Sequence, residues 1–459
     1  MSANPLADPQ LTMARVVSAV GILAHLSLAS SFLGTIALAV IGEYIWLRHK
    51  DQTWLDLAKK FNIAATIFFG VGAAFGTLVE FGLVTLWSNF IAIIGTAIAL
   101  PFFLELFAFL FEVVLLPLYT FTWNKFRNPW AHWTIGLLAA FGGYYSAYNI
   151  LAVMSMMSVK PPGLEIVNLG AAGKNVAGAI YYIAQWASPS DEWNQFWWGA
   201  NVFIFHGILA AVILSWSGVL GVTLALYLRE KKEWQTKVLR LVAPVVAILV
   251  AIEGFLLGHF QGELVVEHDP LKLAALEGMF WSGLKTDPLT GLVAYGNPNA
   301  QFWGYYSWPA DIRPPEWVSV FYLGFMVGAG ILLGILTAGV GLYFRWGLFK
   351  RIVPPLLKPS AYLIPILAAL ASIGGAVSAE SGRFPFILVS SSPDPNGGPP
   401  IITGVPVYQG GLFNPTLQLT PWLTALIIIV EVAMPALAGY MVYLALASPP
   451  KILKRYIEY

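Results

Sequence analysis

The sequence predicts an all-α integral membrane protein with about nine transmembrane helices, and its composition is the first reason. Of the 459 residues, 58% are hydrophobic and only 11% are charged, whereas a soluble domain carries about a quarter charged residues. Apolar stretches long enough to cross a hydrocarbon core of roughly 30 Å recur along the whole chain. Backbone groups in lipid must be hydrogen-bonded within the protein, so segments this apolar are expected to be helices.

The predicted spans follow one another through a single membrane domain, residues 1–459. They cover residues 17–45, 62–85, 92–121, 134–158, 198–227, 239–260, 317–344, 360–380 and 420–446. The first apolar segment continues as a full span and lacks the short core and cleavage site of a signal peptide. The longest connection, residues 261–316, is rich in Gly, Pro and aromatic residues, which favours compact irregular structure with short interfacial helices.

The basic residues indicate the orientation. Alternate loops on one side hold 18 of the 25 Lys and Arg residues. The opposite side holds the other seven: Arg15, Lys160, Lys174, Lys272, Lys285, Arg313 and Arg383. The positive-inside rule therefore predicts a multi-pass protein of the cell membrane with its N-terminus outside and its C-terminus in the cytoplasm.

Two features of the composition exclude classes of function. The net charge of +1 gives no reason to expect a nucleic-acid partner. The chain has no cysteine, which excludes disulfides, iron–sulfur clusters and cysteine-based zinc sites.

Ionisable residues inside the predicted spans need a partner or a role, since each costs about 2.5–3.5 kcal/mol at a helix centre. They include His25, Glu80, Glu105, Glu112, His206, Glu253, Glu380 and Glu431. Imidazole nitrogen and thioether sulfur are the usual neutral axial ligands of haem iron. His25, His206 and Met326 are therefore candidate haem ligands, although a lone membrane His is more often a packing residue and a lone Met a core filler.

Glu105 and Glu112 are seven residues apart on the third predicted helix. They project from nearly the same face, about 10 Å apart along the axis. Two stacked carboxyl groups in a membrane are typical of a proton relay, and the alternative is a pair that faces a polar patch of a partner subunit.

A secondary transporter or channel is the main alternative from another class. It would explain the spans and the buried carboxylates, but not the two His residues and the Met. The chain also lacks the interrupted repeat that is typical of such transporters.

From Arg15 to the last span, the chain resembles subunit I of the cytochrome bd-type quinol:O2 oxidases. The similar features keep their order: Arg15 ten residues before His25, Gly-Thr-Leu-Val-Glu80-Phe-Gly, Phe-Leu-Phe-Glu112, His206, Lys272-Leu-Ala-Ala-Leu-Glu277, Met326-Val-Gly and Glu380-Ser-Gly-Arg383-Phe-Pro-Phe. In the last motif, Phe384 and Phe386 stand where the family has Gln and Trp. Those departures leave open which quinone is used and whether the O2-binding haem is of the d or b type.

The resemblance implies three haems in this subunit, two of b type and a third high-spin haem of d or b type. His206 and Met326 would ligate a low-spin haem b, while His25 and Glu380 would each ligate one high-spin haem. Which of those two serves the O2 site stays open. Arg15 and Arg383 would neutralise haem propionates.

The resemblance also implies the reaction. Residues 261–316 would form an external quinol-binding loop in which Lys272 and Glu277 contact the quinol. Glu105 and Glu112 would carry cytoplasmic protons, by way of the partner subunit, to O2 that is reduced to water without a proton pump. A second membrane subunit is expected, and a small single-span subunit is left open. A non-catalytic haem-binding paralogue of the oxidase is the remaining alternative.

Overall fold

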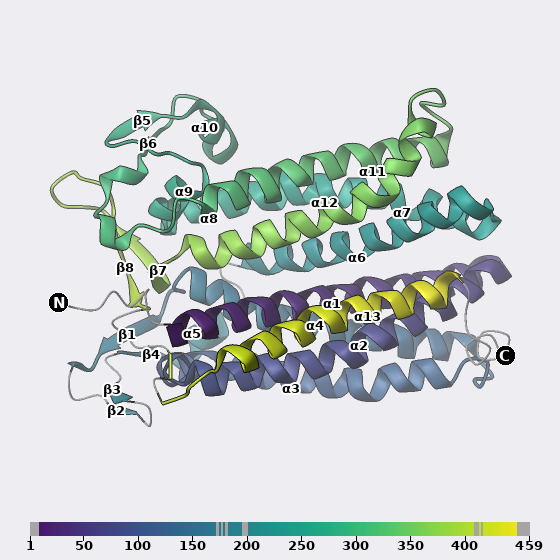
Figure 1. Ribbon diagram of the computed structural model, residues 1–459, viewed down its shortest axis with the longest axis horizontal. Coiled ribbons are helices and arrows are strands. Elements are labelled where there is room, and N and C mark those ends of the chain that lie inside the picture. Colours follow the sequence, from purple (N-terminus) through teal and green to yellow (C-terminus); the bar gives the residue numbers. More distant parts are fainter. Residues whose placement is uncertain are drawn as a thin grey trace.

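The structure is a computed structural model that describes residues 9–170, 174–175, 178–179, 182–194, 201–407, 413–414 and 416–447. Within this part of the chain, nine helices are long and apolar enough to cross a membrane. They run side by side along the long axis of the molecule, and the short elements gather at one end (Figure 1). The prediction of an all-α membrane protein is therefore confirmed. Three of the basic residues used to predict the orientation, Lys451, Lys454 and Arg455, lie outside the described residues.

Six of the nine spanning helices in the described residues are longer than the apolar stretches that predicted them, and the fifth, seventh and ninth match theirs in length to within one residue. The helices are α1 (Pro9–His49), α2 (Gln52–Leu86), α3 (Ser88–Phe121), α4 (Pro129–Ser158), α6 (Asn201–Glu230), α7 (Glu233–Ile252) continued by η4 (Glu253–Leu257) and α8 (Gly258–His268), η7 (Val320–Gly328) continued by α11 (Ala329–Trp346), α12 (Val353–Gly382) and α13 (Pro421–Ala447). The segments η4 and η7 are wound as π-helix, which is rare and is often found at functional sites.

The sixth helix differs most from its prediction. It continues as α8 to His268, so the first eight residues of the predicted 261–316 loop are helical. The helix ends at Asp269, whose side chain accepts a hydrogen bond from the backbone N–H of Lys272 at 3.1 Å and so caps the next helix, α9 (Pro270–Leu276). A polar cap followed by Pro270 starts a new helix because proline suits the first helical position.

Short elements form the end of the molecule that lies beyond the helices. They are α5 (Pro189–Asn194), α10 (Pro288–Tyr295), η5 (Tyr305–Ser307), η6 (Ala310–Ile312) and four two-stranded antiparallel sheets: β1 (Leu164–Asn168) with β4 (Tyr182–Trp186), β2 (Lys174–Asn175) with β3 (Gly178–Ala179), β5 (Leu284–Thr286) with β6 (Gln301–Trp303), and β7 (Phe386–Ser392) with β8 (Ile401–Pro406). The hairpins are a feature that the prediction of irregular loops missed. β7 and β8 pair because each carries apolar and β-branched residues and the Gly- and Pro-rich turn between them cannot continue a strand.

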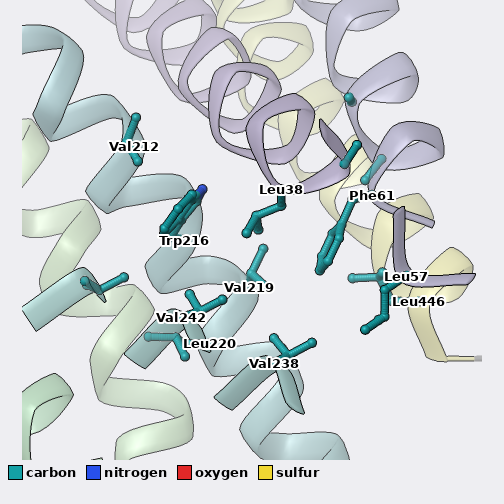
Figure 2. Close-up of a cluster of buried hydrophobic side chains, with 14 of the residues drawn as sticks. Leu38, Leu57, Phe61, Val212, Trp216, Val219, Leu220, Val238, Val242 and Leu446 are labelled. Carbon is teal, nitrogen blue, oxygen red and sulfur yellow. The ribbon is translucent and has the colours of Figure 1, made fainter. Parts of the chain in front are cut away.

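The main apolar core joins helices that are far apart in the sequence. Leu38 of α1, Phe61 of α2 and Trp216 of α6 all belong to it (Figure 2). The Trp216 indole N–H donates to the Gly34 carbonyl oxygen at 2.9 Å, which satisfies the polar atom of a buried ring. This contact fixes α6 against α1 and thereby sets the positions of the two histidines that these helices carry.

Candidate functional site

His25 lies on α1 with its ring against α2. Its Nδ1 is 3.1 Å from the carbonyl oxygen of Gly72, and a carbonyl can only accept a hydrogen bond. Nδ1 therefore carries the proton, which leaves a lone pair on Nε2, the arrangement of a metal-ligating histidine. A Cβ at Gly76 would lie 3.0 Å from Cε1 of the ring, so α2 presents bare backbone to His25.

His206 lies on α6 opposite a carboxyl group that the sequence analysis did not assign to the site. Its Nδ1 lies 3.0 Å from Oε1 of Glu253, the first residue of the π-helical segment η4. Neither atom makes a hydrogen bond within the part of the chain that the structure describes. The extra residue in the π-turn directs Glu253 toward α6, so the His206 side chain faces a polar atom in an otherwise apolar layer.

Met326 lies on the second π-helical segment, η7, which packs against α12. A Cβ at Gly375 would lie 3.4 Å from the Met326 sulfur, and a Cβ at Gly374 would lie 2.6 Å from its backbone nitrogen. Only glycine permits so close an approach of the two helices. α6 also packs against α12, so α12 contacts both of the elements that carry His206 and Met326.

Glu380 and Arg383 lie together at the end of α12, where their side chains form an ion pair. The second oxygen of Glu380, Oε1, and Nη1 of Arg383 are buried without a hydrogen-bond partner among the described residues. Arg15 on α1 faces the same corner, with its guanidinium carbon 5.7 Å from the centre of the Phe384 ring. The free oxygen of this carboxylate can bind a metal ion. The two neighbouring guanidinium groups can bind carboxylate groups that are attached to the same ligand as that ion.

Lys272 is buried against the same end of α12. Its side-chain nitrogen donates to the carbonyl oxygen of Ala379 at 3.1 Å, and its stem would touch a Cβ placed at Gly382. Burial lowers the pKa of Lys272 to about 8, although the neighbouring Asp269 opposes this shift. Burial also raises the pKa of Asp269 to about 7, against the effect of the Lys272 charge.

Glu277 lies at the other end of α9 and forms a hydrogen bond with the Tyr322 side chain of η7. Burial raises the pKa of Glu277, and the bond from Tyr322 partly offsets that shift. Tyr322 is four residues before Met326, and sequence analysis missed it because its role depends on a contact between distant segments. The two predicted loop residues are thus attached to two different helices that carry candidate ligands.

The carboxyl groups of α3 form a separate group. The Ser146 hydroxyl of α4 donates to Oε1 of Glu105 at 3.1 Å. Glu112 is 5% exposed, and its Oε1 would lie 3.1 Å from a Cβ at Gly143 of α4. Both residues therefore face α4, as their seven-residue spacing predicts. Glu80 on α2 lies within electrostatic reach of Glu105.

Sequence analysis missed a third group, formed by Glu43 of α1, Tyr119 of α3 and His132 of α4. Glu43 follows the apolar core of its span, and His132 stands just before the predicted 134–158 span, so both resemble ordinary interfacial residues. The sequence feature that could have identified this group is the position of Tyr119, which lies seven residues after Glu112, as Glu112 lies seven residues after Glu105.

The fold and these side chains define a multi-pass cell-membrane protein whose half-buried candidate ligands are imidazole, thioether and carboxylate groups, the set that can hold haem iron. The close glycine contacts at His25 and Met326 and the unpaired atoms of Glu380 and Arg383 fit such a group. The chain belongs to the family of cytochrome bd terminal oxidase subunit I, whose model matches residues 13–447. It is thus a subunit of a respiratory terminal oxidase, and membership implies haem cofactors, a quinol and O2 as substrates and a second subunit.

Individual relatives agree with this assignment. The chain is 26% identical over 418 residues to the cytochrome bd ubiquinol oxidase subunit 1 of Bacillus subtilis (strain 168), covering 83% of this chain and 84% of the relative. It is 24% identical over 391 residues to a putative cytochrome bd menaquinol oxidase subunit I of the same organism, covering 79% and 84%. The fold matches a chain of the bd oxidase from Geobacillus thermodenitrificans with a TM-score of 0.75 at 21% identity, covering 96% of this chain and 99% of that one.

Proposed function

We propose that this subunit oxidises quinol at the outer face and passes the electrons to O2, which is reduced to water with protons from the cytoplasm. The observation that carries the proposal is the attachment of the α9 segment. Lys272 is bonded to Ala379 beside Glu380, and Glu277 is bonded to Tyr322 one turn before Met326. A quinol bound at α9 would therefore lie next to both helices that carry candidate haem ligands.

The haems are held by residues from four helices. His206 and Met326 ligate a low-spin haem b, and His25 and Glu380 each hold one of two high-spin haems, one of b type and one of d or b type. Haem, when bound, supplies the iron that carries electrons and binds O2. Arg383 and Arg15 hold propionates by charge-assisted hydrogen bonds.

Within the external loop, residues 261–316, Glu277 accepts a proton from a quinol hydroxyl as electrons leave. Lys272 contributes to binding, because its ammonium group can donate to a quinol oxygen. Protons from the quinol are released outside, where the N-terminus lies, and the positive-inside loops face the cytoplasm.

Glu105 and Glu112 carry protons inward from the cytoplasm toward the O2 site. The separation of proton release from proton uptake moves charge across the membrane without a pump. The second membrane subunit binds this chain. The names of the relatives mention ubiquinol and menaquinol. Both molecules are two-electron quinol donors, and we propose a donor of this class for this chain.

The test is an absorption spectrum of the purified two-subunit protein together with an O2-electrode assay with quinol. Strong Soret and alpha bands with quinol-dependent O2 consumption are expected. A spectrum without haem bands would instead favour a transporter or channel. Haem bands without quinol oxidation would identify a non-catalytic paralogue.

A further inference from the structure

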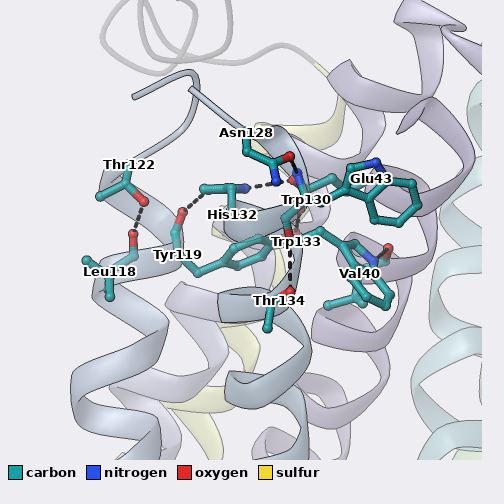
Figure 3. Close-up of polar contacts among 10 residues, drawn as sticks. All are labelled: Val40, Glu43, Leu118, Tyr119, Thr122, Asn128, Trp130, His132, Trp133 and Thr134. Atoms are coloured by element: carbon teal, nitrogen blue, oxygen red, sulfur yellow. Dashed lines mark hydrogen bonds and ion pairs between the residues drawn. The ribbon is translucent and has the colours of Figure 1, made fainter. Parts of the chain in front are cut away.

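A buried hydrogen-bonded cluster ties together α1, α3 and α4 (Figure 3). It lies toward the helix ends that are opposite the hairpins (Figure 1). The two carboxyl oxygens of Glu43 contact Nδ1 of His132 and the hydroxyl of Tyr119, each at 2.8 Å. Nε2 of His132 lies 2.9 Å from the Tyr119 carbonyl oxygen. The exposed fractions of Glu43, Tyr119 and His132 are 1%, 0% and 4%, so the groups are shielded from water.

The partners of His132 fix how many protons the cluster holds. A carbonyl oxygen only accepts, so Nε2 of His132 carries a hydrogen. The other ring nitrogen then faces the Glu43 carboxyl group across 2.8 Å, and one proton occupies this contact. It belongs either to an imidazolium beside a carboxylate or to a carboxylic acid beside a neutral imidazole. The contact therefore stores one transferable proton in a dry environment.

The cluster lies on the same face of α3 as the two carboxyl groups of that helix. Glu105, Glu112 and Tyr119 are spaced seven residues apart, so they lie on one strip of the helix with about 10 Å between neighbours. α4 covers this strip with glycines. A Cβ at Gly136 would lie 2.5 Å from the Tyr119 ring, and one at Gly143 would lie 3.1 Å from Oε1 of Glu112.

Aromatic side chains of the loop between α3 and α4 pack against His132. The centre of the Trp123 ring lies 4.3 Å from the centre of the His132 ring, and the Phe126 ring lies 6.1 Å away. His132 is four residues into α4, within one turn of the helix start at Pro129. It therefore packs against two aromatic residues of the loop that holds Lys125 and Arg127.

We infer that the Glu43–His132 pair is the site where this subunit takes up protons from the cytoplasm, with Tyr119 as the exit toward Glu112. This inference rests on the proposed oxidase function and orientation. It gives the subunit an entrance of its own, in addition to supply through the partner. One proton enters at His132 and passes to Glu43. The Tyr119 hydroxyl, which donates to Glu43 at rest, rotates away, releases its proton toward Glu112 and then takes up the proton held by Glu43, so every group returns to its initial state.

The experiment uses the complete two-subunit oxidase, fully reduced and mixed with O2, with proton uptake followed by a pH-sensitive dye. Tyr119→Phe removes only the hydroxyl, and Glu43→Gln keeps the size of the side chain but cannot carry the proton. Tyr144→Phe is the matched control, because this part-buried hydroxyl of α4 donates to a backbone group, the carbonyl of Leu33. We expect proton uptake to slow roughly tenfold in both test variants, with normal haem spectra and normal haem reduction by quinol.

A purely structural cluster predicts a different result. In that case the variants would lower thermal stability or haem content but would take up protons at the wild-type rate. Wild-type uptake in either variant at full haem content would overturn the inference, and if Glu43→Gln does not assemble, Tyr119→Phe decides alone. Failure of the proposed function would be visible earlier, as missing haem bands or missing quinol oxidation in the unmodified protein.

Discussion

Lys272 donates a hydrogen bond to the carbonyl oxygen of Ala379, the residue directly before Glu380. A residue of the proposed quinol loop is therefore attached to the helix end that carries a candidate haem ligand. Lys272→Ala removes this bond and a cation at the proposed site. We expect a higher apparent quinol KM with little change in kcat, the sign of lost ground-state binding. Steady-state O2 consumption over a range of quinol concentrations measures this, and an unchanged KM would place quinol elsewhere.

The proposed low-spin haem depends on His206 and Met326. His206→Ala or Met326→Leu should abolish the reduced low-spin alpha band and quinol oxidation, because an electron-transfer haem needs both axial ligands. Leu preserves the volume of Met at a packing cost usually below about 1.5 kcal/mol, so the fold should survive. Reduced-minus-oxidised difference spectra provide the measurement. If both variants retained the band, the assigned ligands would be wrong.

The side chain of Glu277 gives the reaction a pH dependence with a definite sign. Burial raises the pKa of this carboxyl group above its ordinary value, and a protonated carboxyl cannot act as a base. The rate of quinol oxidation should therefore fall as the pH is lowered through that raised pKa, and Glu277→Gln should be slow at every pH and lack this acid limb. The haem spectrum should be unchanged. Rate profiles of both proteins test this, with an artificial donor that bypasses quinol as the control.

The contact of α2 with His25 can be tested by adding one methyl group. Gly76→Ala places a Cβ 3.0 Å from Cε1 of the imidazole ring, so the ring must move away from its ligating position. We expect loss of one high-spin haem, measured by haem extraction. Gly70→Ala on the same helix is the control, since nothing lies within 4 Å of its Cβ and alanine favours a helix by about 1 kcal/mol. Equal haem content in the two variants would show that His25 does not bind a haem.

Glu112 is buried against α4. Glu112→Gln keeps the size and hydrogen bonding of the side chain but cannot release a proton, whereas Glu112→Asp still titrates. The Gln variant should turn over roughly 100-fold more slowly, with haem reduction by quinol less affected than the steps that consume protons. The Asp variant should keep part of the activity. Single-turnover oxidation by O2 resolves these steps, and wild-type proton uptake in the Gln variant would return Glu112 to a structural role.

The nine spans could be predicted from the sequence because a bilayer imposes one length and one composition on every crossing segment. Pairs on one helix, such as Glu105 and Glu112, could also be predicted, since helical periodicity fixes their relative direction. The hydrogen bond between Glu277 and Tyr322 could not, because it joins segments separated by a loop whose path no periodicity specifies. The π-winding at Glu253 and Met326 was likewise invisible, since it is a local response to packing against α6 and α12.

The helix α9 is bonded to the membrane helices near both of its ends, and this affects how the segment that follows it can change in length. Because Lys272 and Glu277 are each bonded to a helix, the seven-residue α9 keeps its position independently of the residues that come after it in the chain. The segment with α10 and the β5–β6 hairpin extends outward from that fixed base, and Leu289, Leu292 and Tyr295 of α10 are exposed. Insertions or deletions near Asn297 and Pro298 can therefore remodel this surface, and with it contacts to other molecules, while α9, the proposed quinol-binding segment, stays in register with the membrane helices.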